Sequence, residues 1–314
     1  ITRMNFLFDL TPDVQNVIAI VGAITAIVAA SIGLVQNDIK KVLAYSTVSQ
    51  LGLMFLALGL GAYEVAVFHV ITHAFFKACL FLGSGSVIHA LHGEQDMRNM
   101  GGLRKVMPIT FWTMMISTLA ISGIFPFSGF WSKDEILMTA FHGNIPLWII
   151  GSIASIMTAF YMFRLMYLTF FNDFRGTEEQ KHHLHESPAL ITIPLVILAT
   201  LAAIGGAISL PGNSWLNHYL APLFKKHEAH HLDGQAYMLM AIATVGALIG
   251  IGIAYSKYLK KKEIPVADSE VQGLHKVLSN KYYLDEIYMA TIVKPIYMIS
   301  SFAKKYVEKF ISKA

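Results

Sequence analysis

Long apolar runs alternate with short polar stretches along most of the chain. Each run is close to the roughly 20 residues that an α-helix needs to cross the hydrocarbon core of a bilayer. The pattern predicts an all-α fold: a polytopic membrane helix bundle with about seven spanning helices. The predicted segments cover residues 14–35, 42–61, 63–91, 107–141, 146–171, 189–210 and 236–258.

The fourth segment, 107–141, is interrupted in its middle. Gly123, Pro126 and Gly129 lie close together there, and a proline removes a backbone donor and clashes with the preceding turn. We therefore expect one broken helix. Charged Lys133 and Asp134 follow the break directly, a pattern that transporters use at their ion sites.

The chain changes character after the seventh segment. The stretch "SKYLKKKEIPVADSE" is polar, and residues 275–312 alternate apolar and basic positions with helical periodicity. Such a helix is expected to lie on the membrane surface rather than to cross it.

Composition supports lipid as the surrounding solvent. Hydrophobic residues make up 55% of the 314 positions and charged residues only 14%, with a mean hydropathy of +0.54, whereas soluble domains average about 25% charged residues. The single cysteine, Cys79, excludes an internal disulfide framework. The bilayer is thus the expected environment.

The formal net charge of +4 does not indicate a nucleic-acid partner, because the basic residues cluster at the ends of apolar runs. They are concentrated in alternate loops, at 40–41, 98–105, 175–181 and 257–262. The positive-inside rule places these loops in the cytoplasm and the start of the first segment outside.

Three ionisable residues share one side of the third segment. His69, His73 and Lys77 follow one another at intervals of four, so they form a stripe on a helix. A lysine at bilayer mid-depth costs about 2.5–3.5 kcal/mol on insertion scales, and burial favours its neutral form. Single waters can bridge groups one helical turn apart, about 5.4 Å. The stripe predicts a path for protons, and Lys133 with Asp134 is expected to continue it.

A structural alternative accompanies each of these residues. The stripe would then only form hydrogen bonds between helices, and Asp134 or Glu135 would only neutralise Lys133 at the helix break. Arg164 is expected to be structural, and Asp38 to form a cap or an interfacial pair. Four polar residues near the start of the second segment either line a hydrated entrance or pack helix against helix: Ser46, Thr47, Ser49 and Gln50.

One motif points to a different chemistry. His227, Glu228 and His231 have the H-E-x-x-H spacing of zinc proteases, and His230 and Asp233 lie close by. No apolar helix surrounds the motif to hold it rigid, so a membrane zinc protease is a remote alternative. The chain has no phosphate-binding glycine loop or cysteine cluster, and neither a cofactor nor a resident metal is expected in it.

Several stretches resemble one family closely. "LVQNDIKKVLAYSTVSQLGLMFLALG", "FHVITHAFFKACLFLGSGSVIHA" and "GFWSKDEIL" are similar to segments of the antiporter-like subunits of proton-pumping NADH:quinone oxidoreductase, respiratory complex I. The best match is the largest of these, subunit L or chain 5. "HESPALITIPLVIL" and "KYYLDEIYMATIVKP" resemble its later portion, so the likeness covers nearly the whole chain.

The resemblance implies a site and a role. His69, His73 and Lys77 would belong to the central hydrophilic axis that relays protons, and Lys133 with Asp134 would end the outer half-channel. Quinone reduction elsewhere in the complex would drive the charge changes, with no redox catalysis in this chain. The implied partners are other membrane subunits of complex I, especially neighbouring antiporter-like subunits, in a bacterial inner membrane or an organelle equivalent.

The resemblance also implies how the chain is organised. Residues 1–171 correspond to the second half of the antiporter-like module, 172–262 to additional membrane helices, and 263–314 to the start of a lateral amphipathic helix. The family's subunit has about eight further helices before these, so the chain is expected to be a C-terminal part of a longer protein. The alternatives are a subunit of a multi-subunit sodium/proton antiporter, which has the same helices, and a purely structural strap.

Overall fold

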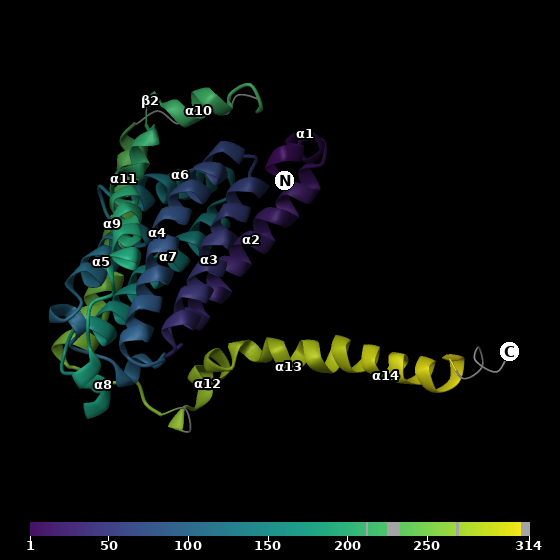
Figure 1. Cartoon of the computed structure of the whole chain (residues 1–314). Helices are drawn as coiled ribbons and strands as arrows, with labels where there is room; N and C mark the ends of the chain where they lie inside the picture. The colour runs from purple at the N-terminus through teal and green to yellow at the C-terminus, as the bar shows by residue number, and fades with distance from the viewer. Residues whose placement is uncertain (212, 225–232, 268–269, 309–314) are drawn as a thin grey trace. The chain divides into compact units, whose positions relative to one another are not determined.

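The structure is a computed structural model that describes residues 1–211, 213–224, 233–267 and 270–308. The chain divides into two compact units, Ile1–Pro265 and Val266–Ala314. The first unit is a bundle of long helices that run side by side (Figure 1).

The first unit contains eleven of the helices that the structure describes and one short hairpin, in which β1 (Ser209–Leu210) pairs antiparallel with β2 (Asn213–Ser214). The helices are α1 (Asn5–Phe8), α2 (Pro12–Gly33), α3 (Ile39–Gly59), α4 (Tyr63–Ala90), α5 (Pro108–Ser122), α6 (Ser128–Gly143), α7 (Ile145–Phe170), α8 (Glu178–His183), α9 (Ala189–Ile204), α10 (Trp215–Leu220) and α11 (Gly234–Ala254).

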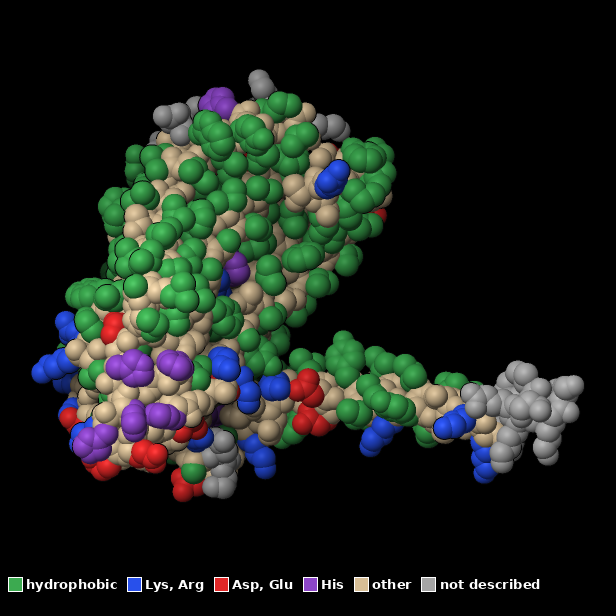
Figure 2. Space-filling model, viewed as in Figure 1, with side chains coloured by type: hydrophobic (Ala, Val, Ile, Leu, Met, Phe, Trp, Pro, Cys, Tyr) green, Lys and Arg blue, Asp and Glu red, His purple; other side chains and the backbone are tan. Residues whose placement is uncertain are grey.

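The predicted membrane segments are confirmed. Among the described residues, six helices are long and apolar enough to cross a bilayer, and they contain α2, α3, α4, α7, α9 and α11. The remaining segment, the fourth in the sequence, is the broken one, because residues 123–127 separate α5 from α6. Figure 2 shows hydrophobic side chains over the face of the bundle, with most charged side chains and histidines at one end.

Small residues let α2 and α3 approach closely. A Cβ atom on Gly22 would lie 2.5 Å from the backbone nitrogen of Leu56, and one on Gly52 would lie 2.5 Å from that of Ala26. Such contacts replace the hydrophobic driving force that helices lack inside lipid. A glycine also lets α11 pack closely on α7, because a Cβ on Gly250 would lie 2.6 Å from the carbonyl oxygen of Ile156.

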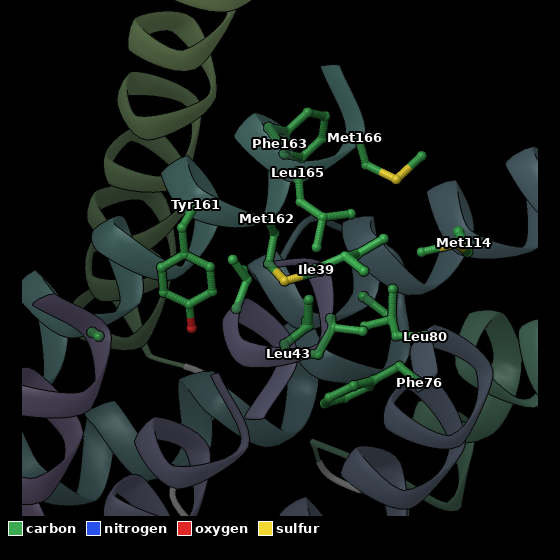
Figure 3. Close-up of a cluster of buried hydrophobic side chains, with 14 of the residues drawn as sticks. Ile39, Leu43, Phe76, Leu80, Met114, Tyr161, Met162, Phe163, Leu165 and Met166 are labelled. Carbon is green, nitrogen blue, oxygen red and sulfur yellow. The ribbon is translucent and has the colours of Figure 1, made fainter. Parts of the chain in front are cut away.

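The apolar core lies where α3, α4, α5 and α7 meet. Its fully buried side chains include Ile39, Leu43, Phe76, Leu80 and Met114. Figure 3 shows these side chains beside a run from α7 that includes Tyr161 and Met162. This packing fixes the rotation of α3 and α4, and therefore which of their polar residues face each other.

The four basic loops lie together at one end of the first unit, in agreement with their predicted common side. The amide of Ile39 donates to the carbonyl of Gln95 (2.9 Å), and the amide of Met97 donates to the carbonyl of Asn37 (2.9 Å). Arg175 Nε donates to the carbonyl of Arg98 at 2.8 Å. Lys262 Nζ lies 3.3 Å from Asp173 Oδ2, which brings in the loop after α11. The assignment of this end to the cytoplasm stays a prediction.

The second unit is also helical. It contains α12 (Gly273–Ser279), α13 (Leu284–Tyr288) and α14 (Lys294–Phe302), and the turn Met289–Val293 links the last two into one helix. Residues 281–283 have positive φ and interrupt the chain before α13. Within this unit, hydrophobic side chains gather on one side of the helix and lysines on another (Figure 2), which is the amphipathic character that the sequence predicts.

Candidate functional site

The ionisable stripe of α4 faces other helices rather than lipid. His69 is fully buried and Lys77 is 5% exposed, while His73 is half-buried. The rings of His69 and His73 are 6.2 Å apart between centroids, the separation that one helical turn gives. The stripe is thus continuous from His69 to His73.

His69 joins three helices. Its Nδ1 lies 2.9 Å from the hydroxyl of Ser132 on α6, and its Nε2 lies 3.1 Å from Oε1 of Gln50 on α3. The Ser132 hydroxyl is also 2.8 Å from that of Thr72. Because hydroxyl groups both donate and accept, these contacts can reverse direction when a proton moves.

Lys77 is held by neutral acceptors. Its ammonium group donates to the carbonyl of Leu43 at 2.7 Å and to the hydroxyl of Ser46. It also lies 5.5 Å from the centroid of the Phe81 ring, a cation–π distance. No ion pair between Lys77 and a carboxylate is present among the described residues.

The helix break creates the place for Lys133. Helix α5 ends at Ser122, and Gly123 follows with φ of 75°, a left-handed conformation that glycine adopts without steric cost. The amide of Ile124 bonds back to the carbonyl of Leu119 at 3.2 Å, which closes the helix as a Schellman motif does. The broken helix is therefore confirmed, and its first half, α5, ends in carbonyl groups that have no further helical turn to accept from.

Lys133 caps one of those carbonyl groups, that of Ile121. It is 2% exposed, and its Nζ donates to the carbonyl of Ile121 at 2.5 Å. This end of α5 carries the negative pole of the helix dipole, which favours an ammonium group. Gly129 allows the two halves to cross here, because a Cβ at this position would lie 2.0 Å from the carbonyl oxygen of Ala120.

Asp134, the next residue after Lys133, lines a cavity. It is 6% exposed, and its Oδ2 has no hydrogen-bond partner within the described part of the chain. It lines a small cavity between α6, α7 and α11. His73 Nε2 is likewise buried and unpartnered among the described residues.

The structure thus brings the predicted residues together only in part. The contact between His69 and Ser132 connects the stripe on α4 to the turn of α6 that carries Lys133. Sequence reasoning missed Ser132, Thr72 and the carbonyl of Ile121. The sequence offered one signal for Ser132, because this serine directly precedes the charged Lys133 in the broken helix.

The four polar residues of α3 divide between the two interpretations that the sequence left open. Ser46 and Gln50 contact Lys77 and His69, whereas Ser49 donates to the carbonyl of Ala26 at 2.9 Å and packs α3 against α2. Thr47 bonds within its own helix, to the carbonyl of Leu43.

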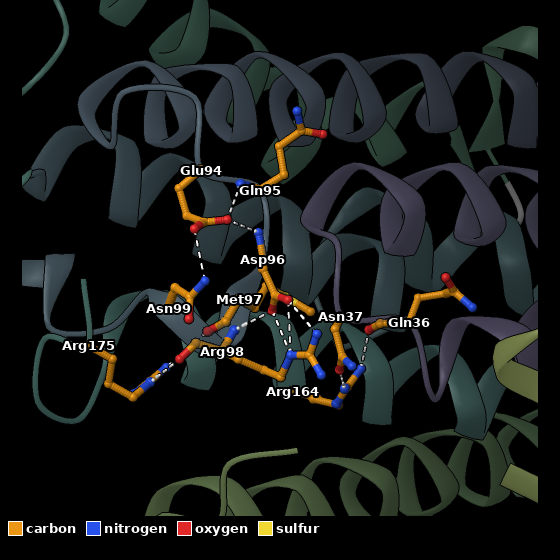
Figure 4. A network of polar contacts seen from close by, with 10 residues as sticks. All are labelled: Gln36, Asn37, Glu94, Gln95, Asp96, Met97, Arg98, Asn99, Arg164 and Arg175. Carbon is orange, nitrogen blue, oxygen red and sulfur yellow. Dashed lines mark hydrogen bonds and ion pairs between the residues drawn. The ribbon is translucent and has the colours of Figure 1, made fainter. Parts of the chain in front are cut away.

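Arg164 and Asp38 lie in a separate network at the end of the bundle, shown in part in Figure 4. Arg164 donates to the carbonyl of Gln36 at 2.6 Å and to Oδ1 of Asn37 at 2.5 Å. Asp38 accepts from the amides of Lys40 and Lys41, as an N-cap does. These contacts agree with the structural roles expected for both residues.

The zinc-protease motif, with His227, Glu228, His230 and His231, lies outside the described residues. Asp233, which follows the motif closely in the sequence, accepts from the amide of Ala236 at 2.8 Å and caps α11. Within the described ranges, no group of three or more His, Cys, Asp or Glu side chains is placed to hold a metal ion.

Curated relatives of this chain are named as subunits of quinone oxidoreductases. It is 47% identical over 321 residues to NAD(P)H-quinone oxidoreductase chain 5 of Picosynechococcus, covering 92% of this chain and 48% of that one. It is 41% identical over 312 residues to NADH-quinone oxidoreductase subunit L of Rickettsia bellii, covering 94% and 47%. The chain therefore spans about half the length of the curated relatives it matches.

Two solved structures are similar. One is the membrane-bound sulfane sulfur reductase, an archaeal respiratory membrane complex, with a TM-score of 0.69 and 26% identity over 93% of this chain and 52% of that one. The other is the Mrp complex of a Dietzia species, with a TM-score of 0.60 and 19% identity over 96% and 34%. The second likeness shows the shared fold alone.

A family model described as "NADH:quinone oxidoreductase/Mrp antiporter, TM" matches residues 1–158, half of the chain. The match includes α2 to α6 and with them the stripe on α4 and the helix break. This chain is a membrane protein that belongs to the NADH:quinone oxidoreductase/Mrp antiporter transmembrane family.

Proposed function

We propose that this chain is the proton-translocating part of a subunit of NADH:quinone oxidoreductase. His69, His73, Lys77, Lys133 and Asp134 relay the protons. The observation that carries the proposal is the burial of two lysines whose ammonium groups donate to neutral oxygen atoms. A buried lysine without an ion pair can lose its proton, which a group of purely structural role has no need to do.

The relay uses reversible hydrogen bonds. A proton leaving Lys77 passes through His73 to His69, with single waters bridging groups one turn apart. Ser132, bonded to His69, hands it to the turn of α6 that holds Lys133. When Lys133 gains the proton, the carbonyl of Ile121 and the α5 dipole stabilise the ammonium form.

The chain's partners and organisation belong to the same proposal. Its relatives are named as subunits of quinone oxidoreductases, so the partners are other membrane subunits of that complex, and redox chemistry takes place outside this chain. We assign residues 1–171 to the second half of the antiporter-like module, 172–262 to additional helices and 263–314 to a lateral helix. The membrane is then an energy-transducing one.

A subunit of a multi-subunit sodium/proton antiporter is the second candidate. The family description names Mrp antiporters, and the Dietzia Mrp complex has a similar fold. The higher identity to quinone oxidoreductase subunits favours the first candidate. Copurification with NADH-oxidising subunits would support it, and copurification with antiporter subunits alone would support the second.

The proposal is tested by Lys133→Met in the assembled complex, reconstituted in proteoliposomes that contain a pH-sensitive dye. We expect proton uptake per NADH oxidised to be abolished while assembly is retained. The matched control is Lys181→Met, because Lys181 forms an exposed pair with Glu178 at 3.3 Å. Parental proton uptake in Lys133→Met would refute the proposal.

A further inference from the structure

A small cavity lies between α6, α7 and α11. It is lined by Asp134 from α6, by Ser152 from α7 and by apolar residues of α11 that include Met240 and Ala243. Asp134 is nine residues from the end of α6 and Ser152 is seven residues from the start of α7, so both lie about 11–14 Å below the same end of the bundle.

Asp134 leaves one oxygen atom without a protein partner. Its side chain is 6% exposed, and Oδ2 has no hydrogen bond within the described part of the chain. An unsatisfied buried polar atom costs about 1–3 kcal/mol, more when it is charged. The cavity it lines measures about 10 Å³, close to the roughly 10–15 Å³ that one water molecule requires.

The lining favours water over a metal cation. Apart from the Asp134 carboxylate and the Ser152 hydroxyl, the cavity wall consists of apolar side chains such as Leu137 and Leu239. A hard cation takes six or more oxygen ligands, whereas a buried water is satisfied by two to four polar partners. Two oxygen groups in an apolar wall match a single water.

We propose that this cavity holds a water that forms the outer step of the proton path, with α11 as its wall. The inference rests on the proposed function. When Asp134 is ionised, the water donates one hydrogen bond to its Oδ2 and accepts one from the Ser152 hydroxyl. When Asp134 is protonated, its O–H donates to the water oxygen and transfers the proton, and the water releases one of its own protons toward the outer end of the bundle. Asp134 is then a carboxylate, which the next proton arriving from the side of Lys133 protonates again.

Helix α11 is held in place for this role. Gly246 and Gly250 bring it against α7, where a Cβ on Gly246 would lie 2.9 Å from a side-chain carbon of Ile156. The family match ends at residue 158, so α11 lies outside the matched region. Trp148, which also lines the cavity, packs edge-to-face on Phe141 with 5.1 Å between the ring centroids.

The inference is tested by filling the cavity from α11. Ala243→Leu places three further carbon atoms at the cavity wall, and we expect proton uptake per NADH to fall by about tenfold or more. Ala241→Leu makes the same change on the exposed side of α11 and should leave uptake at the parental level. Both variants are measured in the complete complex in proteoliposomes.

A second pair keeps the test decisive if Ala243→Leu fails to assemble. Ser152→Ala removes the hydroxyl that orients the water and should lower proton uptake about threefold, which is under 1 kcal/mol, while Ser152→Thr keeps a hydroxyl and should restore it. If Ser152 had only a structural role, Ser152→Thr would not restore the proton uptake that Ser152→Ala loses, and that result would contradict the inference.

The outcomes separate this inference from the proposed function. If Lys133→Met abolishes uptake but the Ala243 and Ser152 variants pump at parental rates, the water site is wrong and the proposed function stands. If Lys133→Met itself pumps at the parental rate, the proposed function fails.

Discussion

Two regions of the bundle bury positive charge in different ways. At the end with the basic loops, Arg164 is 2% exposed and binds the carbonyl of Gln36 and the amide oxygen of Asn37. Within the bundle, Lys77 and Lys133 are 5% and 2% exposed and bind backbone carbonyl groups, with the Ser46 hydroxyl added for Lys77. All three side chains are thus almost fully buried, and in all three the hydrogen-bond acceptors are neutral oxygen atoms, so neither burial nor the acceptors distinguish the two regions.

The side-chain chemistry makes the difference. A guanidinium group stays protonated in proteins and presents a rigid fork of donors, which suits a permanent tie between loops. A lysine ammonium group is a single point that can lose its proton when it is buried. We interpret buried positive charge as structural where it joins chain segments permanently, and the proposed relay requires it to be functional where a neutral amine can still donate to the same oxygen atoms.

The largest expected effect comes from Arg164→Met. The change removes the guanidinium donor from the Gln36 carbonyl and from the partly buried Asn37 side chain, which costs about 3 kcal/mol or more. We expect little assembled complex on a native gel. Arg3→Met, on an exposed arginine, should assemble normally. Full assembly of Arg164→Met would remove the structural half of the comparison.

Gly129→Ala tests the geometry around Lys133. The added Cβ would lie 2.0 Å from the Ala120 carbonyl oxygen, so α5 and α6 must separate and the bond between Lys133 and Ile121 must lengthen. Proton uptake should fall by about tenfold or more. Gly252→Ala is the matched control, since nothing lies within 4 Å of its added Cβ. Equal uptake in both variants would contradict the role of the break.

Ser46→Ala tests the acceptors of Lys77. It removes the side-chain hydroxyl that accepts from this ammonium group and leaves the Leu43 carbonyl and the Phe81 ring. A hydrogen bond to a charged group contributes about 1.5–3 kcal/mol, so proton uptake should slow several-fold without loss of assembly. Ser155→Ala, whose hydroxyl bonds only to Gly151 of its own helix in the structure, should show no slowing; a similar loss in both would weaken the assignment.

The smallest effect is expected for Asp38→Ala, near Arg164. It removes an N-cap that accepts from Lys40 and Lys41, at a cost of about 1 kcal/mol. Thermal stability should fall slightly while proton uptake per NADH stays at the parental value. A change in uptake would mean that the loop end of the bundle also takes part in translocation.

The sequence predicts most of the fold, because in lipid each spanning helix must satisfy its own backbone and therefore appears as an apolar run. The break was predictable from Gly123, Pro126 and Gly129, since proline and glycine act locally. The amphipathic pattern of residues 275–312 was visible for the same reason.

The partners of the site residues were not predictable. That Ser132 faces His69 depends on the rotation of α4 and α6, whose contacting residues are 63 positions apart in the sequence. That Ile121 offers its carbonyl to Lys133 depends on the angle at which the chain turns between α5 and α6. Ser46 and Ser49 look alike in the sequence, and only packing against α2 sends one to Lys77 and the other to Ala26. The cavity beside Asp134 depends on α11, about 100 residues later.

The most direct test of the central claim is proton translocation by Lys77→Arg in the assembled complex. Arginine keeps the positive charge and its hydrogen-bond donors but does not release its proton. If Lys77 acts by gaining and losing a proton, the variant should assemble at the parental level and translocate no protons through this chain. Translocation at the parental rate would show that a fixed charge is sufficient at this position, and the relay would be contradicted.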